Sequence, residues 1–273
     1  MKALQDKKFI RREDLHDQER HGGMAKIYLG LPAYNEEASI EPLFQRIHKY
    51  QNMTGTSLAI VFYDDGCQDR TKENVLSWND RLEIIYLDGI VNRGLGEGMN
   101  ALISEFVRVG SPDDILVVMD CDDTHDPAQI TEMLSTFIRY PRTDIVIASR
   151  YRRGSTISGV PMHRVLLSIG AALLYKIVHP ARHVRDYTCG YRAYTYSIAD
   201  KTLRAYTAPL LKERGFACMV ELLLKCKYAG ARFREIPLRL AYDNKLSASK
   251  MDVSANTSKL LKRLISWRVQ GLQ

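Results

Sequence analysis

Short apolar segments alternate with helical patterns from residue 26 to residue 149, and this alternation constrains the fold more than any other feature of the chain. Apolar runs rich in β-branched residues predict strands at 27–31, 58–63, 82–87, 115–119 and 145–149. The segments between them predict helices at 37–50, 71–78, 95–109 and 127–140. Such alternation predicts an α/β fold with a doubly wound, mostly parallel sheet and helices on both faces. Ligands of these sheets bind beyond the carboxyl ends of the strands.

The remainder of the chain follows a different pattern. We expect helices at 161–178, 198–206 and 216–228, a strand at 232–242 and a mobile polar segment at 243–252. Residues 1–24 are dense in charged side chains and predict a mobile extension, which leaves 25–253 as one folded domain. Residues 254–273 predict a basic amphipathic helix. That helix fits an anionic lipid surface, and packing on its own domain is an equal alternative.

Composition and charge restrict the class of protein. Of the 273 residues, 45% are hydrophobic, which is enough for a sizeable core, and the net charge of +7 suits an anionic substrate or an acidic membrane surface. We expect no nucleic-acid partner, because no basic run is interleaved with aromatic residues. The five cysteines lack CxxC spacing, and no secretory leader or transmembrane segment is evident, so we expect a cytoplasmic protein.

An acidic loop follows the predicted strand at 115–119. Asp120 and Asp122 lie two residues apart at the end of this strand, where they can present oxygens to one divalent cation. The structural alternative is a polar loop that caps the next helix, with Asp126 as N-cap and Pro127 in the first helical position. The two interpretations are compatible.

Other strand ends also carry polar or aromatic groups. Tyr34 offers a face for stacking, and Asp64 and Asp65 form a pair of carboxylates that favours ligand recognition, with an ordinary turn as the alternative. The glycines of the segment 92–100 resemble a dinucleotide fingerprint, but Met99 replaces the last glycine and the segment follows the third strand. We therefore reject a Rossmann site and expect these glycines to allow close approach to a nucleotide or to the acidic loop.

Four motifs in order carry a resemblance to a known family: LPAYNEE at 31–37, DDGCQDRT at 64–71, NRGLGEGMN at 92–100 and DCDDTHDP at 120–127. They are similar to the inverting family 2 glycosyltransferases of GT-A fold, and in particular to dolichyl-phosphate mannose synthases and other polyprenyl-phosphate glycosyltransferases. The resemblance continues through ASRY at 148–151 and DYTCGYRAY at 186–194, and it covers roughly residues 26 to 251.

The resemblance implies roles for individual residues. The nucleotide would be surrounded by Pro32, Tyr34, Glu36, Phe62, Asp64 and Cys121. The groups acting on the donor diphosphate and the acceptor phosphate would be Asp120, Asp122, Arg150 and Lys250. A Mg²⁺ or Mn²⁺ cofactor would be held by Asp122, with Thr124 and Asp120 as further ligands. His125 belongs to the same motif, and its structural alternative is a hydrogen bond that stiffens the loop.

Two departures from the family pattern are evident. Thr124 stands where the mannose synthases place Gln, and Lys245 and Ala248 stand in a loop that usually contains Arg and Gly. Some relatives also carry C-terminal transmembrane helices, and from this sequence we expect none. If the acceptor is a lipid, the helices at 161–178 and 254–273 must therefore supply the membrane contact. The alternative for the first of these is a core helix.

The resemblance implies transfer of a sugar from a GDP- or UDP-sugar to a polyprenyl phosphate with inversion at the anomeric carbon. Such a protein would work in the cytoplasm, peripherally on the cytoplasmic face of a membrane. One alternative is a soluble family 2 transferase that acts on a glycan, protein or small-molecule hydroxyl. A more distant alternative is a non-catalytic nucleotide-sugar binding protein.

Overall fold

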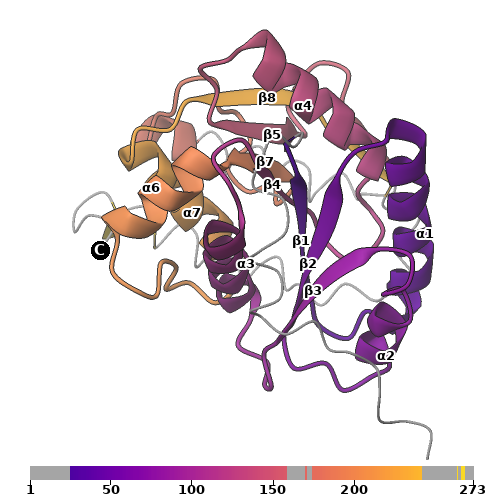
Figure 1. Cartoon of the computed structure of the whole chain (residues 1–273). Helices are drawn as coiled ribbons and strands as arrows, with labels where there is room; N and C mark the ends of the chain where they lie inside the picture. The colour runs from indigo at the N-terminus through magenta and orange to yellow at the C-terminus, as the bar shows by residue number, and fades with distance from the viewer. Residues whose placement is uncertain (1–24, 159–169, 171–173, 242–262, 264–265, 268–273) are drawn as a thin grey trace, which may run out of the picture.

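The computed structural model describes residues 25–158, 170, 174–241, 263 and 266–267, and Figure 1 shows their arrangement. One sheet has the strand order β3-β2-β1-β4-β7-β5-β8. Its strands are β1 (Ile27–Ala33), β2 (Leu58–Asp64), β3 (Glu83–Asp88), β4 (Ile115–Val118), β5 (Ile145–Ser149), β7 (Arg192–Thr195) and β8 (Phe233–Pro237). All neighbours pair in parallel except β7, which is antiparallel to both β4 and β5. The predicted mostly parallel α/β sheet is confirmed.

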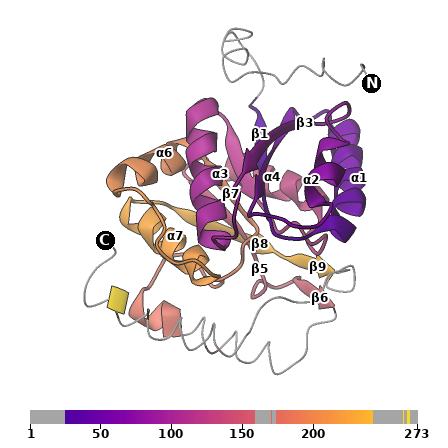
Figure 2. The same cartoon turned by 90° about the horizontal axis from the view of Figure 1, so that it is seen from below.

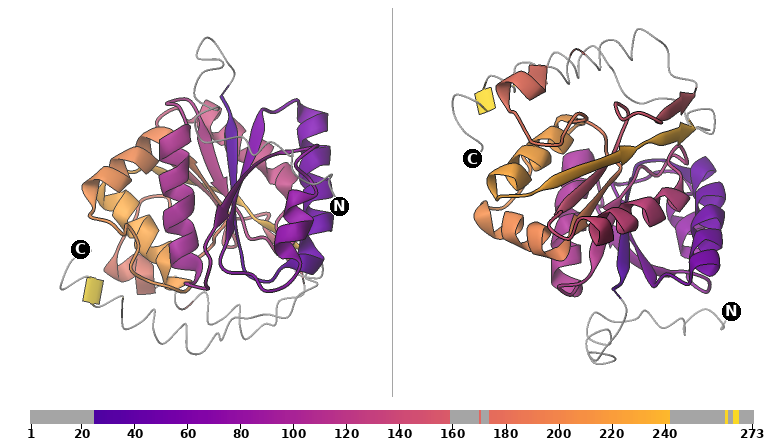
Figure 3. Two further views of the ribbon diagram at one scale, coloured as in Figure 1. Left: turned by 60° about the horizontal axis from the view of Figure 1, so that its bottom comes forward. Right: turned by 90° about the horizontal axis from the view of Figure 1, so that it is seen from above.

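Helices cover both faces of this sheet, and Figures 1 and 3 show the strands running between the two helical layers. One layer contains α3 (Leu95–Val109), α6 (Tyr196–Ala205) and α7 (Ala217–Tyr228). The other contains α1 (Glu37–Thr54), α2 (Thr71–Leu76), the 3-10 turn η1 (Pro127–Gln129) and α4 (Ile130–Arg139). Strands β2, β4 and β5 are buried at every residue, which explains why they read as unbroken apolar runs rather than as alternating ones.

The strand predicted at 232–242 is divided in two. After β8, Arg239–Ala241 forms β9, which pairs in parallel with β6 (Thr156–Ser158) in a separate two-stranded sheet. The buried side chain of Gln129 fixes this division. Its amide donates to the Pro237 carbonyl (2.8 Å) and accepts from the Arg239 N–H (2.8 Å). Strands β6 and β7 were not predicted from the sequence.

Several predictions lie wholly or partly outside the described residues: the extension 1–24, most of the helix 161–178, the segment 243–252 and most of the helix 254–273. Of the last, Arg263, Ser266 and Trp267 are helical. Arg263 pairs with Glu213 (2.5 Å) and Trp267 is buried, so these residues pack on the domain. In the described part of the chain, no helix has the length and apolar character needed to cross a bilayer.

Candidate active site

The loops after β1 and β2 are bound to each other at the carboxyl edge of the sheet. Asn35 has a left-handed backbone (φ 53°), and its side-chain oxygen accepts from the Gln68 N–H (2.8 Å). The Glu36 N–H donates to the Thr71 hydroxyl (2.8 Å). The first two motifs therefore form one unit, which carries the candidate nucleotide residues Pro32, Tyr34, Glu36 and Asp64.

Asp64 is buried and held on both of its oxygens. One oxygen accepts from the Cys67 N–H (2.6 Å), and the other accepts from the Tyr86 hydroxyl on β3. Burial and the hydrogen bond to Asp64 raise the pKa of Tyr86, so the phenol stays protonated as a donor. Phe62 stacks on Tyr86 with 5.7 Å between ring centroids and has no exposed surface. In this structure Phe62 is a core residue that supports Tyr86, and the expected direct nucleotide contact is not available to it.

Asp65, the second carboxylate of the pair, has a structural role. It accepts from the backbone N–H groups of Arg93 (2.7 Å) and Gly94 (2.8 Å). Burial raises the pKa of Asp65, and these two bonds oppose the shift. Asp65 therefore anchors the loop between β3 and α3, which is the turn alternative of the sequence analysis.

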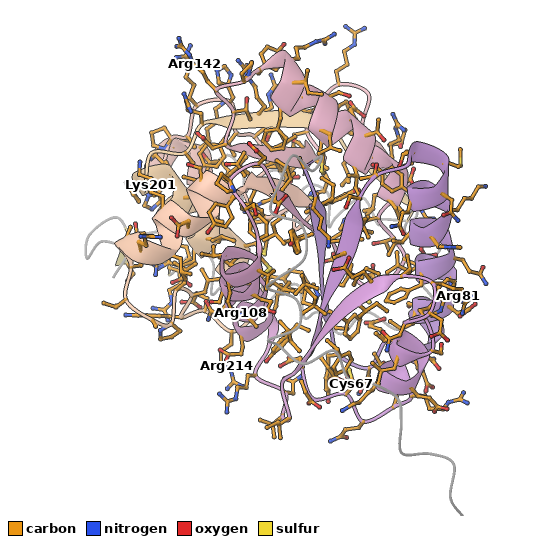
Figure 4. The ribbon with its side chains drawn as sticks, in the orientation of Figure 1. Cys67, Arg81, Arg108, Arg142, Lys201 and Arg214 are labelled. Carbon is orange, nitrogen blue, oxygen red and sulfur yellow. The ribbon has the colours of Figure 1, made fainter. Side chains whose placement is uncertain are left out.

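The glycines of the segment 92–100 serve packing inside the protein. A Cβ atom on Gly96 would lie 1.9 Å from the Glu213 carbonyl oxygen, and one on Gly94 would lie 2.5 Å from that of Arg214. The Gly96 N–H donates to the same Arg214 carbonyl (3.1 Å). Gly94 and Gly96 thus admit the backbone of residues 213–214 rather than a nucleotide or the acidic loop, whereas a Cβ atom on Gly98 would lie 3.1 Å from Pro32 Cβ and 3.1 Å from Tyr63 Cδ1. Figure 4 labels Arg214 and Cys67 along this edge of the sheet.

The acidic loop follows β4, and its first carboxylate is open to solvent. The Asp120 side chain is 39% exposed, and its N–H donates to His125 Nδ1 (3.2 Å). His125 itself is buried, with its ring 4.9 Å from that of Tyr191. His125 therefore stiffens the loop, as its structural alternative predicted.

Asp122 is partly exposed and is oriented by Thr124. The Thr124 hydroxyl donates to Asp122 Oδ1 (2.7 Å), and the Thr124 N–H lies 3.3 Å from the same oxygen. Thr124 is only 3% exposed, and its carbonyl accepts from the Ala241 N–H (3.1 Å). The structure thus places Thr124 as a buried donor to Asp122 and not as an open ligand beside it.

The end of the acidic loop caps the helical segment that follows. The Asp126 side chain accepts from the Ala128 N–H (3.1 Å), and Pro127 occupies the first position of η1. The predicted N-cap is confirmed. Arg46 of α1 also contacts the Asp126 carboxylate (3.2 Å), so the loop is fixed from a second helix.

Arg150, after β5, forms a two-pronged ion pair with Asp186. Arg150 Nε lies 2.8 Å from Asp186 Oδ2 and Nη2 lies 2.7 Å from Oδ1, while the Asp186 side chain has no exposed surface. Burial lowers the pKa of Arg150, but the Asp186 carboxylate raises it by more. The guanidinium is charged and fixed in place, and Nη1 makes no hydrogen bond to a described residue.

One contact joins the acidic loop to the loop that holds Asp186. A Cβ atom on Gly190 would lie 3.3 Å from Asp120 Oδ1, so the loop that holds Asp186 passes beside the acidic loop. Cys121 is buried, and burial together with the Glu36 charge raises its pKa far above the ordinary value. Glu36 is therefore close enough to Cys121 to influence it. Asp120 therefore lies beside the loop that fixes Arg150, whereas Lys250 is outside the described residues.

Carboxylate oxygens are the ligands that Mg²⁺ and Mn²⁺ prefer, and Asp120 and Asp122 are partly exposed carboxylates of this loop. Asp126 is also partly exposed, but it caps η1 and pairs with Arg46. Within the described residues, no group of three or more His, Cys, Asp or Glu side chains is arranged to hold a metal ion. The two aspartates therefore offer a partial coordination shell that suits a metal whose other ligands are water and phosphate oxygens.

Two residues of this region, Tyr86 and Arg46, and the pairing of Asp186 with Arg150 were not predicted from the sequence. Asp186 was part of a quoted motif, and its position in that motif was a usable signal. No signal in the sequence identified Tyr86 or Arg46, because each is an ordinary residue for a strand or a helix. Their contacts to Asp64 and Asp126 join residues 22 and 80 positions apart.

Comparison with known proteins gives three kinds of match. A family model described as glycosyl transferase family 2 matches residues 28–203. A dolichol-phosphate mannosyltransferase of Pyrococcus furiosus is 29% identical over 205 residues, which are 75% of this chain and 54% of that protein. The chain thus spans about half the length of this relative. An undecaprenyl-phosphate mannosyltransferase of Micrococcus luteus is 34% identical, over 81% of this chain and 85% of that protein.

A polyprenol monophosphomannose synthase of Mycolicibacterium smegmatis is 26% identical over 88% of this chain and 86% of that protein. Among solved structures, glucosyl-3-phosphoglycerate synthase from Mycobacterium tuberculosis, in complex with Mn²⁺, UDP and phosphoglyceric acid, superposes with a TM-score of 0.63. The match covers 90% of this chain and 79% of that one at 16% identity, so it bears on the fold alone.

Proposed function

The chain belongs to glycosyl transferase family 2, and on that basis we propose that it transfers a sugar from a nucleotide-sugar donor to a polyprenyl phosphate. Three relatives whose names specify polyprenyl or dolichol phosphate mannosyl transfer support this acceptor class. The observation that carries the proposal is the approach of two loops. Asp120 and Asp122 lie on one, and the loop of Asp186, which fixes Arg150, passes beside Asp120 at Gly190.

The donor nucleotide, GDP or UDP, would lie over the joined loops after β1 and β2. Pro32, Tyr34 and Glu36 supply an apolar turn, an aromatic face and a carboxylate on the first loop. Asp64 is already oriented by the Cys67 N–H and Tyr86. A preorganised carboxylate costs less to order when the nucleotide binds, which supports a role for Asp64 in recognition.

Asp122 and Asp120 would hold Mg²⁺ or Mn²⁺, with donor phosphate oxygens completing the coordination. When bound, the metal stabilises the negative charge that develops on the departing nucleoside diphosphate. Thr124 keeps Asp122 Oδ1 in a fixed direction through its hydroxyl. In this proposal Thr124 contributes to the metal site through Asp122.

The acceptor phosphate supplies the nucleophile. A phosphate monoester has a second pKa of about 6, so it is largely ionised at neutral pH and needs no strong general base. Its oxygen forms a bond to the anomeric carbon while the bond from that carbon to the diphosphate oxygen breaks, which inverts the configuration. Arg150, fixed by Asp186, would hold a phosphate, and we assign the same role to Lys250.

A lipid acceptor places the protein on the cytoplasmic face of a membrane, with peripheral contact to anionic lipid. The helices expected at 161–178 and 254–273 are candidates for that contact. Trp267 is buried in the domain, which favours internal packing at least for that residue of the second helix.

The experiment incubates the purified chain with labelled GDP-mannose, UDP-glucose or UDP-N-acetylglucosamine, polyprenyl phosphate and Mg²⁺ or Mn²⁺. We expect label to enter the organic phase with one donor, and Asp122→Asn to abolish this. Asp113→Asn, at an exposed carboxylate in the loop before β4, is the matched control and should retain activity. Label that stays in water for every donor, with transfer to a soluble hydroxyl acceptor, would favour the alternative transferase. Nucleotide-sugar binding without any transfer would favour a binding protein.

A further inference from the structure

A cluster of basic side chains lies on the loops next to Arg150. We call Arg152, Arg182, Arg185 and Arg234, with His183 among them, the arginine cluster. Arg152, Arg182, His183 and Arg185 are exposed, and Arg234 is half-buried with its guanidinium 4.2 Å from the ring centre of Tyr140. None of these residues has a place in the proposed transfer reaction.

The loops that carry Arg152 and residues 182–185 are bound to each other, and Arg234 lies on the neighbouring strand β8. Arg185 Nη1 donates to the Tyr151 carbonyl (3.4 Å), and Glu235 of β8 accepts from the N–H groups of Arg185 (2.6 Å) and Asp186 (2.8 Å). The Arg150–Asp186 pair joins the same loops. The arginines are therefore presented by a fixed surface that continues directly into the candidate phosphate-binding residue Arg150.

The charge of this surface is not balanced. Within the described residues, no carboxylate lies at ion-pair distance from any of the four arginines. Asp186 forms its ion pair with Arg150, and the buried Glu235 carboxylate accepts hydrogen bonds from backbone N–H groups. Slight burial and the charges of Arg234, Arg182 and Arg152 lower the pKa of His183. The surface should attract a multivalent anion.

Exposed apolar side chains lie on the segment that leads into the cluster. Leu174 and Ile177 are 41% and 68% exposed and lie one helical turn apart, within the short helical stretch seen near α7 in Figure 2. This stretch is anchored to the cluster loop, because Tyr175 stacks on Tyr187 (5.7 Å between centroids) and the Tyr187 hydroxyl donates to the His179 carbonyl (3.0 Å). Exposed apolar groups close in sequence to exposed basic groups are typical of proteins that lie on a bilayer.

We propose that the arginine cluster binds the phosphate groups of an anionic lipid bilayer. This binding would hold the membrane surface next to the loops that carry Arg150. Guanidinium groups pair with phosphate through two parallel hydrogen bonds, which suits lipid headgroups. The choice of a bilayer rests on the proposed function, because a lipid-linked acceptor must reach Arg150 from a membrane. The exposed Leu174 and Ile177 favour a bilayer over a nucleic acid, which would gain little from them.

Sedimentation with vesicles tests the proposal. The full chain should bind vesicles of phosphatidylcholine with phosphatidylglycerol, bind pure phosphatidylcholine poorly, and dissociate as salt rises. The double variant Arg152→Gln/Arg182→Gln should weaken binding to anionic vesicles on the order of tenfold. The matched control Lys49→Gln/Lys201→Gln removes the same charge from α1 and α6, where Figure 4 labels Lys201, and should bind like the unmodified chain.

Equal binding by the double variant, equal binding to neutral vesicles, or no binding by the unmodified chain would each overturn the proposal. A double variant that loses affinity for RNA but not for vesicles would do so as well. An assay of transfer to a short polyprenyl phosphate dispersed in detergent tests the proposed function independently of the membrane surface. Intact transfer by a chain that does not bind vesicles refutes the membrane surface alone. Binding to anionic vesicles that depends on Arg152 and Arg182, without transfer, refutes the proposed function and still supports the membrane surface.

Discussion

Arg46 on α1 holds Asp123 in the middle of the acidic loop, with Nη1 2.6 Å from the Asp123 carboxylate and 3.2 Å from its carbonyl. Asp123 is buried and has a left-handed backbone (φ 59°), which is uncommon for a residue other than glycine. The contact neutralises a carboxylate that is not a proposed metal ligand and keeps the turn that points Asp122 outward. Arg46 is therefore a positioning residue for the metal loop.

Replacement of Arg46 tests this role. We expect Arg46→Met to lower the free energy of unfolding by about 2 kcal/mol, because a hydrogen-bonded charged pair is lost. It should also raise the Mg²⁺ or Mn²⁺ concentration needed for half-maximal transfer. Lys49→Met, one turn further along α1 and exposed, is the control. Addition of Asp123→Asn should recover part of the stability, and a purely additive double variant would argue against direct coupling.

Tyr86 should affect donor binding more than the chemical step. Tyr86→Phe leaves Asp64 without one of its two hydrogen-bond donors, so the carboxylate must be ordered when the nucleotide binds. We expect the KM for the nucleotide sugar to rise about tenfold with a smaller change in kcat. Steady-state kinetics measure both values. Tyr28→Phe, whose hydroxyl contacts the Val109 carbonyl away from this site, is the control. A lower kcat at constant KM would contradict the assignment.

The role of the Thr124 hydroxyl in orienting Asp122 can be tested with two substitutions of similar size. Thr124→Val removes the hydroxyl that donates to Asp122, whereas Thr124→Ser keeps it. We expect the valine variant to need about tenfold more metal for half-maximal activity and the serine variant to behave like the unmodified chain. Metal titrations of transfer measure this. Equal metal requirements for valine and threonine would show that the hydroxyl does not orient Asp122.

The Arg150–Asp186 pair predicts a pH-dependent contribution to stability. Burial raises the pKa of Asp186, but Arg150 lowers it by more, so the folded-state pKa lies below the unfolded value of about 3.9. The stabilisation is present above that value and is lost as the pH falls through the folded-state pKa. Asp186→Asn should cost about 3 kcal/mol at pH 7, since it leaves Arg150 without its counter-charge. Denaturant unfolding at pH 7 and pH 3 should show the deficit shrinking in acid, and a constant deficit would contradict the prediction.

Much of the fold could be predicted because buried parallel strands are apolar and short. The bounds of α3 and β5 agree with the prediction, since both are set by clear changes from apolar to polar residues. The antiparallel strand β7 was hidden because its first residue is Arg192. That side chain is fully buried and donates to the carbonyls of Met219 and Tyr187, contacts that no local pattern reveals.

The candidate site was predictable in position but less so in detail. The strand ends identified Asp64, Asp120 and Asp122, because the fold brings these ends to one edge. The glycines at 94 and 96 were expected to approach a nucleotide or the acidic loop, whereas their neighbours are backbone atoms of residues 213–214. Phe62 was assigned to the nucleotide and lies in the core. These roles depend on contacts between segments distant in the sequence.

The central claim is that the sugar is transferred to a polyprenyl phosphate with Asp122 as the principal metal ligand. The most direct measurement is the partition of labelled sugar into organic solvent, with the unmodified chain, Asp122→Asn and Asp113→Asn assayed side by side. We predict organic label for the unmodified chain and Asp113→Asn, and a loss of at least a hundredfold, on the order of 3 kcal/mol in the barrier, for Asp122→Asn. Organic label that is undiminished in Asp122→Asn, or absent with every donor, would contradict the claim.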